Sequence, residues 1–370
     1  MRDYHGLIFA YNVYPALREL VSVRTAASLP FCGRYRLIDL ALSSMRNAGI
    51  LDVGVVMQRD YQSLLDHIGS GKAWDMSRRT GGLRMLPPFG LPEYHTGNYN
   101  GTIEALNSVA PYIRDLNANH IVLLLGNLCA NVDLTKAIRQ HNSSGADITA
   151  ICADHDNASV QHRFVVGEDG LVERMLLYRQ GGGEGLPTLE GYIIHKDLLL
   201  DLMDRCKAQH LYNFHQDALP MFFADGGKMD VYVHQGYSRL VCNVEDFYAV
   251  NLDMLDPEKR RQVFPADRPV RTKAHEEVSA YYSDTAVSRR SLVADNCIIE
   301  GEIEDSIIFS GARVAPGAKL KGCVVMRGCT IGEGVELENV IADKHCSFSA
   351  GVKLTGSPKL PMVVPKNSKI

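Results

Sequence analysis

The chain has 370 residues, 46% hydrophobic and 22% charged, which is typical of a globular protein with one very large or two ordinary domains. The net charge of −4 gives no indication of a nucleic-acid-binding surface. The N-terminus turns polar too soon for a signal peptide, and no apolar run approaches membrane-spanning length. The nine cysteines are scattered without a CxxC pair, which favours reduced thiols. We therefore expect a cytoplasmic protein.

Residues 1–254 alternate between strand-like and helix-like segments. Strands are predicted within 5–11, 52–58, 120–127 and 146–154, a hairpin within 163–178, a strand running into a helix within 185–203, and helices within 35–49, 60–69 and 102–116. Gly49 is expected to end the first of these helices. Apolar strands separated by helices indicate an α/β domain of Rossmann-like architecture, with a mostly parallel sheet covered on both faces.

Two further segments interrupt or follow this pattern. Residues 69–101 are rich in glycine and proline, and a loop of that length in a compact domain is usually functional or a lid. Residues 255–286 begin with a proline-rich, highly charged stretch and are predicted to be a surface linker between domains.

From residue 287 to 370 the pattern becomes a repeat of about six residues. Apolar side chains recur at intervals of five or six, with glycines between them, at Val314, Leu320, Val325, Ile331 and Leu337. One such unit cannot bury its apolar residue alone, whereas stacked triangular coils bury them in one column. The repeat therefore predicts a left-handed parallel β-helix, and ordinary short antiparallel strands are the less favoured alternative.

The turn after the first strand carries unusual chemistry for its position. In a doubly wound domain this turn lies where nucleotide phosphates bind, and glycines there let backbone N–H groups approach the anion. Here the turn reads Tyr11-Asn12-Val13-Tyr14-Pro15, which has no glycine, and its proline donates no N–H.

Several phrases resemble the glucose-1-phosphate adenylyltransferase (ADP-glucose pyrophosphorylase) family. They are PFCGRYRLIDLALSSMRNAGI (30–50), HIGSGKAWDMSRRTGGLRMLPP (67–88), YNGTIEAL (99–106), NFHQDALP (213–220) and GYSRLVCNVEDFYAVNLDML (236–255). The resemblance implies a nucleotidyltransferase domain, a β-helix domain and a tetramer. It also implies a reaction of ATP with glucose 1-phosphate that gives ADP-glucose and pyrophosphate for glycogen.

Matching this sequence to the family's motifs indicates that the catalytic groups are missing. Tyr11, Asn12 and Tyr14 fall on the glycines of the phosphate loop, Ala16 on its arginine and Ala26 on the following lysine, while only Leu17 matches. Asn127 and Leu240 fall on the two metal-binding aspartates. The sugar-phosphate lysine has no clear counterpart, and Arg179 is the nearest cation. We therefore predict no catalytic residues and no metal site.

Other family positions are retained. Tyr99, Gly101 and Thr102 match the purine contact, although Asn98 replaces its tryptophan, and Gly191 matches a glycine near the sugar pocket. Turn geometry explains the two glycines at least as well. Arg24, Arg34 and Arg36 fall where the family binds allosteric sugar phosphates, and ordinary pairing with acids explains them equally well. Trp74 and His67 are expected to be structural, and the other histidines and the turn holding Glu302, Glu304 and Asp305 are expected at the solvated surface.

Three functions follow from these observations. The favoured one is a regulatory subunit, as in the D-type branch of the family. Such a subunit binds a catalytic paralogue and leaves the binding of Mg²⁺ and the turnover of ATP to that partner. A sugar-phosphate or nucleotide effector, a heterotetramer, or assembly alone as a homo-oligomer would be compatible with this function. The second is a weakly active adenylyltransferase in which Glu104, Asp217 and Glu245 could hold a metal. The third is a hexapeptide acyltransferase, for which His345 is the sole histidine in the repeats.

Overall fold

The computed structural model describes residues 3–11, 14–87, 99–156, 159, 162–177, 183–274 and 276–370. The chain forms two compact units. Unit 1 consists of residues 1–12, 38–240 and 264–271, and unit 2 consists of residues 13–37, 241–263 and 272–370. The segment that follows the first strand therefore belongs to the unit that contains the β-helix, while the predicted boundaries 1–254, 255–286 and 287–370 stay a prediction.

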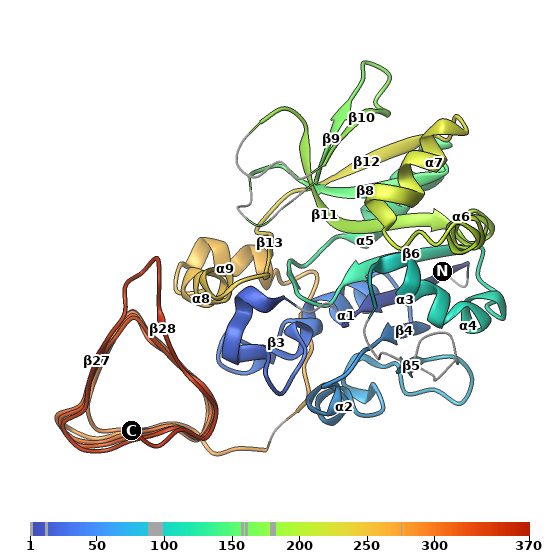
Figure 1. The fold of residues 1–370 in the computed structure, drawn as a ribbon. Coiled ribbons are helices and arrows are strands. Elements are labelled where there is room, and N and C mark those ends of the chain that lie inside the picture. The colour runs from blue at the N-terminus through green and yellow to red at the C-terminus, as the bar shows by residue number, and fades with distance from the viewer. Residues whose placement is uncertain are drawn as a thin grey trace. The chain divides into compact units, whose positions relative to one another are not determined.

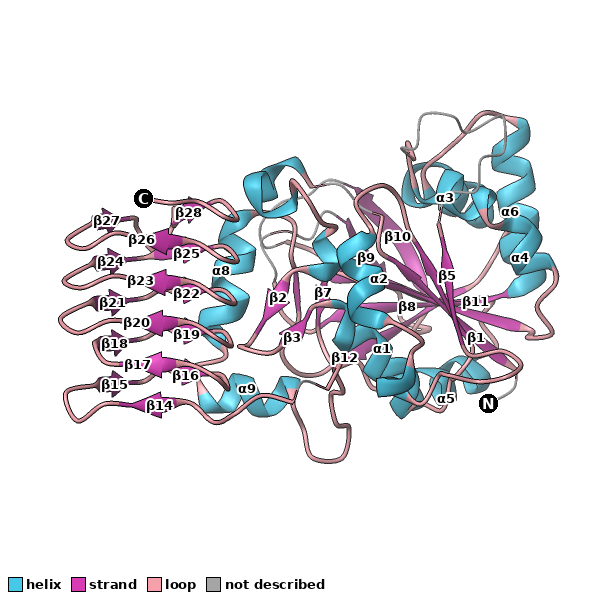
Figure 2. Cartoon of the chain, turned by 90° about the horizontal axis from the view of Figure 1, so that it is seen from below, coloured by secondary structure: helices cyan, strands magenta, loops and turns pink. Residues whose placement is uncertain are grey.

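Unit 1 is built on a sheet whose described strands run in the order β10-β9-β11-β6-β1-β4-β5, while β8 pairs with β11 and β12 pairs with β8 (Figures 1 and 2). The strands are β1 (Tyr4–Phe9), β4 (Val53–Val56), β5 (Leu83–Leu86), β6 (His120–Leu125), β8 (Ile148–Ala153), β9 (His162–Val166), β10 (Val172–Leu177), β11 (Leu186–His195) and β12 (Met229–His234). Strands β6, β1, β4 and β5 are parallel, and β11 runs antiparallel to both β6 and β8. Because β1, β4, β6 and β8 are almost wholly buried, their apolar sequences are those of a sheet covered on both faces.

The helices of unit 1 are α1 (Ile38–Asn47), α2 (Gln62–Ile68), α3 (Thr102–Ser108), α4 (Ala110–Arg114), α5 (Leu134–Ser144), α6 (Lys196–Ala208) and α7 (Leu219–Ala224). The prediction that Gly49 ends α1 is confirmed, since Gly49 adopts a φ of +74° and its N–H donates to the carbonyl of Arg46. The single helix predicted over 102–116 is wrong. Val109 is not helical, and a new helix begins at Ala110 with Pro111 in its first turn, where the missing N–H of proline costs nothing.

The structure also tests the predicted hairpin, the predicted long loop and the structural roles predicted for Trp74 and His67. The hairpin over 163–178 is confirmed as β9 and β10 around the turn at Gly170. The predicted loop over 69–101 contains strand β5, which pairs with β4, and its residues 88–98 lie outside the described part of the chain. Trp74 is fully buried and packs edge-on against His67, whose Nε2 lies 2.6 Å from Oδ1 of Asp39, so both residues are structural as expected.

The β-helix of unit 2 is confirmed. Fifteen short strands form three parallel five-stranded sheets, which make the three sides of the triangular coil in Figure 1 and stack as the rungs of Figure 2. The first side holds β14 (Tyr281–Tyr282), β17 (Ile298–Ile299), β20 (Arg313–Val314), β23 (Thr330–Ile331) and β26 (Ser347–Phe348). The second holds β15 (Val287–Arg289), β18 (Glu302–Glu304), β21 (Lys319–Lys321), β24 (Glu336–Glu338) and β27 (Lys353–Thr355). The third holds β16 (Leu292–Val293), β19 (Ile307–Ile308), β22 (Val324–Val325), β25 (Val340–Ala342) and β28 (Met362–Val364).

The apolar residues that predicted the repeat form one interior column. Val314, Leu320, Val325, Ile331 and Leu337 are each at most 2% exposed and lie on successive sides of the coil. Burying an aliphatic side chain contributes about 1.5–3 kcal/mol. The stacked coils therefore supply a core that a single coil could not.

Unit 2 also contains short elements from two distant parts of the sequence. These are the 3₁₀ segments Pro15–Val21 and Ala26–Ser28, the strands β2 (Pro30–Phe31) and β3 (Tyr35–Arg36), and the helices α8 (Val244–Asp253) and α9 (Pro257–Val263). Helix α9 lies within the segment predicted to be a linker. The hydroxyl of Tyr248 in α8 donates to the carbonyl of Gly322, which attaches this helix to the β-helix. Within the described residues, no helix is long and apolar enough to cross a membrane.

Candidate functional site

Tyr11 lies just after the carboxyl end of β1. At this position the family resemblance implies a glycine of a phosphate loop. Its side chain is buried, its hydroxyl donates to Oγ1 of Thr102 at 3.2 Å, and its ring packs edge-on against Tyr99. Burial raises the pKa of the Tyr11 hydroxyl well above its usual value, so the group stays neutral. An aromatic ring therefore lies at the start of α3, in a place where phosphate binding would need exposed N–H groups.

Tyr99, Gly101 and Thr102, the predicted purine contacts, lie together beside this ring. Oγ of Ser108 donates to the Tyr99 hydroxyl at 2.9 Å. A Cβ on Gly101 would lie 2.2 Å from the carbonyl oxygen of Tyr212, which itself accepts the N–H of Ile103. Close backbone packing therefore already requires a glycine at position 101, so its presence gives no evidence for a ligand contact.

Asn127 and Leu240, the positions at which the family resemblance implies two metal-binding aspartates, lie at a pair of short neighbouring strands. Asn127 directly precedes β7 (Leu128–Cys129), and Leu240 of β13 (Arg239–Leu240) pairs with Leu128. Both side chains are 2% exposed. The fold thus brings the two positions together, but an amide and an alkyl group do not make a magnesium site, because Mg²⁺ needs oxygen ligands that include carboxylates. The residues do not fit the metal that the family resemblance implies.

Gly191 lies in β11 and packs into the sheet. A Cβ at this position would lie 3.0 Å from the side chains of Leu124 and Ile151, which is tighter than ordinary contact. The glycine is thus also explained by packing between neighbouring strands. Arg179, the predicted sugar-phosphate cation, lies outside the described residues, as do Asn12 and Asn98.

The three arginines predicted to bind an effector lie in unit 2 and differ in exposure. Arg24 is buried and forms an ion pair with Asp343, with N–O distances of 2.6 and 2.9 Å. Arg34 is exposed, and Arg36 in β3 is half-buried. Burial, followed by the charges of Arg36 and Arg24, lowers the pKa of Lys344 to about 7. Unit 2 therefore holds a concentration of positive charge around Lys344 that Asp343 only partly offsets.

The spare acids of the second hypothesis do not gather into a metal site. Glu104 accepts the N–H of Asn100, Asp217 accepts the N–H groups of Tyr212 and Asn213, and Glu245 lies in the first turn of α8. Among the described residues, one group of three could hold a metal ion, and it contains none of these acids. His345, the candidate of the acyltransferase hypothesis, is exposed.

That group is His162, Glu190 and His215, whose ligand atoms all lie within 4.8 Å of one another. The sequence analysis missed it, because the three residues come from separate segments with no motif spacing. The expectation that the remaining histidines are at the surface is wrong for these two and also for His5, His141 and His234, which are buried. The sequence did offer one signal of burial, an apolar residue near each histidine. Phe164 lies two residues after His162, and Phe214 directly precedes His215.

Burial sets the protonation of this cluster. It lowers the pKa of His162 to about 4 and that of His215 well below its usual value, and it raises the pKa of Glu190 to about 7. The hydroxyl of Tyr192 lies 2.6 Å from Nε2 of His215. Both imidazoles are therefore neutral at pH 7, so each ring has one nitrogen that carries a lone pair and one that carries a proton.

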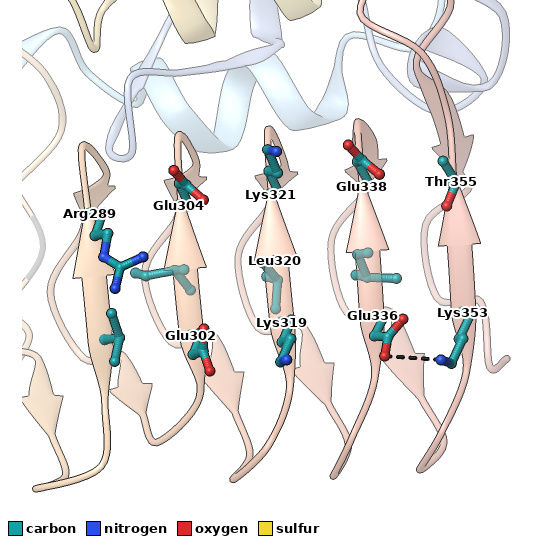
Figure 3. A pocket seen from close by; sticks show the side chains of 13 residues that line it. Arg289, Glu302, Glu304, Lys319, Leu320, Lys321, Glu336, Glu338, Lys353 and Thr355 are labelled. Carbon is teal, nitrogen blue, oxygen red and sulfur yellow. Dashed lines mark ion pairs between the residues drawn. The ribbon is translucent and has the colours of Figure 1, made fainter.

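One face of the β-helix carries charges that alternate in sign from coil to coil. A groove of about 310 Å³ follows strands β15, β18, β21, β24 and β27, whose outward side chains stand in two rows (Figure 3). The coil with Glu302 and Glu304 is followed by one with Lys319 and Lys321 and then by one with two further glutamates. Neighbouring coils attract each other, as in the 3.0 Å ion pair between Lys353 and Glu336.

Comparison with known proteins agrees with this architecture. The Nucleotidyl transferase family matches residues 16–168, and the GlmU-like, C-terminal hexapeptide family matches residues 276–359. The chain is 28% identical over 318 residues to the glycogen biosynthesis protein GlgD of Bacillus subtilis (strain 168), which covers 85% of this chain and 82% of that protein.

Glucose-1-phosphate adenylyltransferases are similarly close. The enzyme of Geobacillus stearothermophilus is 30% identical over 314 residues, covering 82% of this chain and 80% of the relative, and that of Thermomicrobium roseum is 31% identical over 347 residues, covering 88% and 81%. These similarities cover more than four fifths of the chain and therefore extend over both units. The chain belongs to the glucose-1-phosphate adenylyltransferase family.

Proposed function

We propose that this chain is a non-catalytic regulatory subunit of glycogen biosynthesis. In this proposal it assembles with a catalytic paralogue that binds Mg²⁺ and ATP and makes ADP-glucose from ATP and glucose 1-phosphate. The similarity to a protein named for glycogen biosynthesis supports the pathway. The alternative is a weakly active adenylyltransferase in its own right.

The observation that carries the proposal is the pairing of Leu240 with Leu128 beside Asn127. The fold delivers both metal-ligand positions to one place, yet neither residue offers a carboxylate. Removing a single preorganised charge-stabilising donor typically costs about 2.7–4 kcal/mol of barrier. With the metal ligands and the phosphate loop both replaced, this site retains too little electrostatic stabilisation to support adenylyl transfer at a useful rate.

A regulatory subunit acts only through contacts that differ between its partner's states. The charged face along β15 to β27 supports a docking role, because its alternating charges would reject a partner in the wrong register. The positive charge around Lys344 and Arg36 supports a second part of the proposal, an anionic effector such as a sugar phosphate. Assembly as a heterotetramer is part of the same proposal.

Enzyme assays of the purified chain alone, of the catalytic paralogue alone and of the two co-expressed test this function. We expect ADP-glucose synthesis to be at background for the chain alone and to be higher for the mixture than for the paralogue. Robust Mg²⁺-dependent synthesis by the chain alone would instead establish the alternative. An unchanged paralogue, with no complex in size-exclusion chromatography, would contradict both assembly and regulation.

A further inference from the structure

His162, Glu190 and His215 converge from three separate segments of unit 1. His162 begins strand β9, Glu190 lies within β11, and His215 lies in the π-helical turn Phe214–Ala218. The two imidazole rings are 4.2 Å apart between centroids and tilted by 30°. Three potential ligand atoms within 4.8 Å of one another are close enough to surround one cation after small side-chain adjustments.

The backbone around the cluster departs from regular structure at two of the three residues. Glu190 has a φ of +54° at a register shift between β11 and β8, so a bulge sets its orientation. Positive φ is uncommon for a residue other than glycine, and bulges of this kind recur where a side chain is directed into a site. The π-helical geometry at His215 is also rare, and such turns are frequently found at functional sites.

Hydrogen-bond contacts with Tyr192 and Thr188 support His215 and Glu190 of the cluster. Nε2 of His215 lies 2.6 Å from the Tyr192 hydroxyl, which lies 3.4 Å from Oγ1 of Thr188, and this oxygen accepts the N–H of Glu190 at 3.0 Å. Histidines that bind metals characteristically use their second ring nitrogen in such a contact, which fixes the tautomer and the ring orientation. If His215 donates from Nε2 to Tyr192, its Nδ1 carries the free lone pair.

We propose that His162, Glu190 and His215 form a binding site for a divalent first-row transition cation of the zinc class. Two imidazoles and one carboxylate are a common ligand set for Zn²⁺, whereas Mg²⁺ and Ca²⁺ select oxygen ligands. The cation would compensate the Glu190 carboxylate and join β9, β11 and the turn at His215. This site is distinct from the Asn127 and Leu240 positions, and it does not depend on the chain being a regulatory subunit.

Metal titration of the full-length chain, first dialysed against a chelator, tests the proposal with Zn²⁺, Co²⁺ and Mg²⁺ as probes. We expect one tight Zn²⁺ equivalent by calorimetry, a Co²⁺ absorption spectrum of a nitrogen- and oxygen-ligated site, and a higher melting temperature with Zn²⁺ but not with Mg²⁺. The variants His162→Gln, Glu190→Gln and His215→Gln should each weaken Zn²⁺ binding at least tenfold and abolish the thermal shift.

Two controls separate this site from adventitious binding and from misfolding. His210→Asn removes an exposed histidine whose φ of +55° asparagine tolerates, and His155→Asn removes the surface histidine beside Asp154; both should keep the tight site. In chelator, Glu190→Gln should be at least as stable as the parent protein, because it removes a half-buried carboxylate whose charged form is poorly solvated. Absence of Zn²⁺ binding in the parent protein, or undiminished tight binding in the three cluster variants, would overturn the proposal.

Discussion

The guanidinium of Arg24 and the carboxylate of Asp343 form a buried ion pair within unit 2. Nη2 of Arg24 lies 2.9 Å from Oδ1 and 2.6 Å from Oδ2, and the two side chains are 2% and 1% exposed. Asp343 directly follows β25, so this pair attaches segment 13–37 to the third side of the β-helix. An arginine that the family resemblance assigns to an effector is thus already engaged with an acid of its own chain.

Breaking this pair should destabilise unit 2. Because Arg24→Met leaves Asp343 buried without its cation, we expect a loss of about 3–5 kcal/mol in the free energy of unfolding. The variant Asp343→Asn should cost a similar amount, and the double variant should cost clearly less than the sum of the two. Urea unfolding followed by far-ultraviolet circular dichroism measures all three. Strictly additive effects would show that the two charges do not interact.

Gly101→Ala separates packing from ligand binding at the predicted purine contact. The new Cβ would meet the Tyr212 carbonyl, so we expect a loss of about 1–3 kcal/mol of stability even in the absence of any nucleotide. Gly183→Ala is the matched control, since a Cβ there has open space, and it should change stability by less than about 0.5 kcal/mol. Full stability of Gly101→Ala with weakened nucleotide binding would restore the ligand-contact interpretation.

Acid should destabilise unit 1 through buried neutral histidines. Burial lowers the pKa of both His5 and His141 to about 4, whereas an unfolded histidine titrates near 6.5. Between these values the unfolded chain binds the extra protons, so the free energy of unfolding falls as the pH drops from about 6.5 to 4, by roughly 3 kcal/mol for the deeply buried His5 and by less for His141.

The pH dependence can be assigned by substitution. His5→Gln removes one titrating group and can retain a contact with the Tyr112 hydroxyl, which lies 3.0 Å from Nε2 of His5. We expect this variant to lose less stability between pH 6.5 and 4 than the parent protein. The fluorescence of Trp74, the sole tryptophan, reports unfolding of unit 1. Equal slopes for the two proteins would mean that His5 is protonated in the native state.

The sequence predicted those parts of the fold whose signal is local. The six-residue spacing from Val314 to Leu337 reports one buried side chain per strand, so the β-helix could be inferred without long-range information. Helix and strand patterns in the first part were likewise visible, except where a single residue such as Val109 interrupts a continuous apolar pattern. Membership of segment 13–37 in unit 2 involves contacts between residues far apart in the sequence, such as the pair of Arg24 and Asp343, which local patterns do not encode.

The same contrast between local signals and long-range contacts holds for the candidate site. A loss of metal ligands could be predicted at Asn127 and Leu240 because the family resemblance assigns a metal-binding aspartate to each position, and in the structure Leu240 pairs with Leu128, the residue after Asn127. The cluster of His162, Glu190 and His215 could not be inferred, because a bulge and a π-helical turn bring its members together. Irregular backbone is thus where sequence reasoning failed and where a functional role is now proposed.

Introducing carboxylates at Asn127 and Leu240 tests whether these two positions can form the metal site that the family resemblance implies. Asn127→Asp alone should not create Mg²⁺ binding, because Leu240 still offers no oxygen. The double variant with Leu240→Asp should lose stability in chelator through the repulsion of two buried carboxylates, and Mg²⁺ or Mn²⁺ should recover part of it. Melting temperatures with and without each ion measure this. A double variant that is insensitive to both ions would show that further ligands are missing.

Lys344 should make binding of an anionic effector depend on pH. Its pKa of about 7 in the folded chain means that most of its charge is present at pH 6 and largely lost at pH 8. We expect the affinity for fructose 1,6-bisphosphate, measured by calorimetry, to fall about tenfold over this interval, because a charge-assisted hydrogen bond contributes roughly 1.5–3 kcal/mol.

Lys344→Gln should bind weakly at both pH values and remove most of this dependence. Lys321→Gln, which removes an exposed cation of the same unit, should retain the pH dependence of the parent protein. Equal affinity at pH 6 and pH 8 in the parent protein would place the effector away from Lys344, because a bound anion must favour the protonated amine that it contacts.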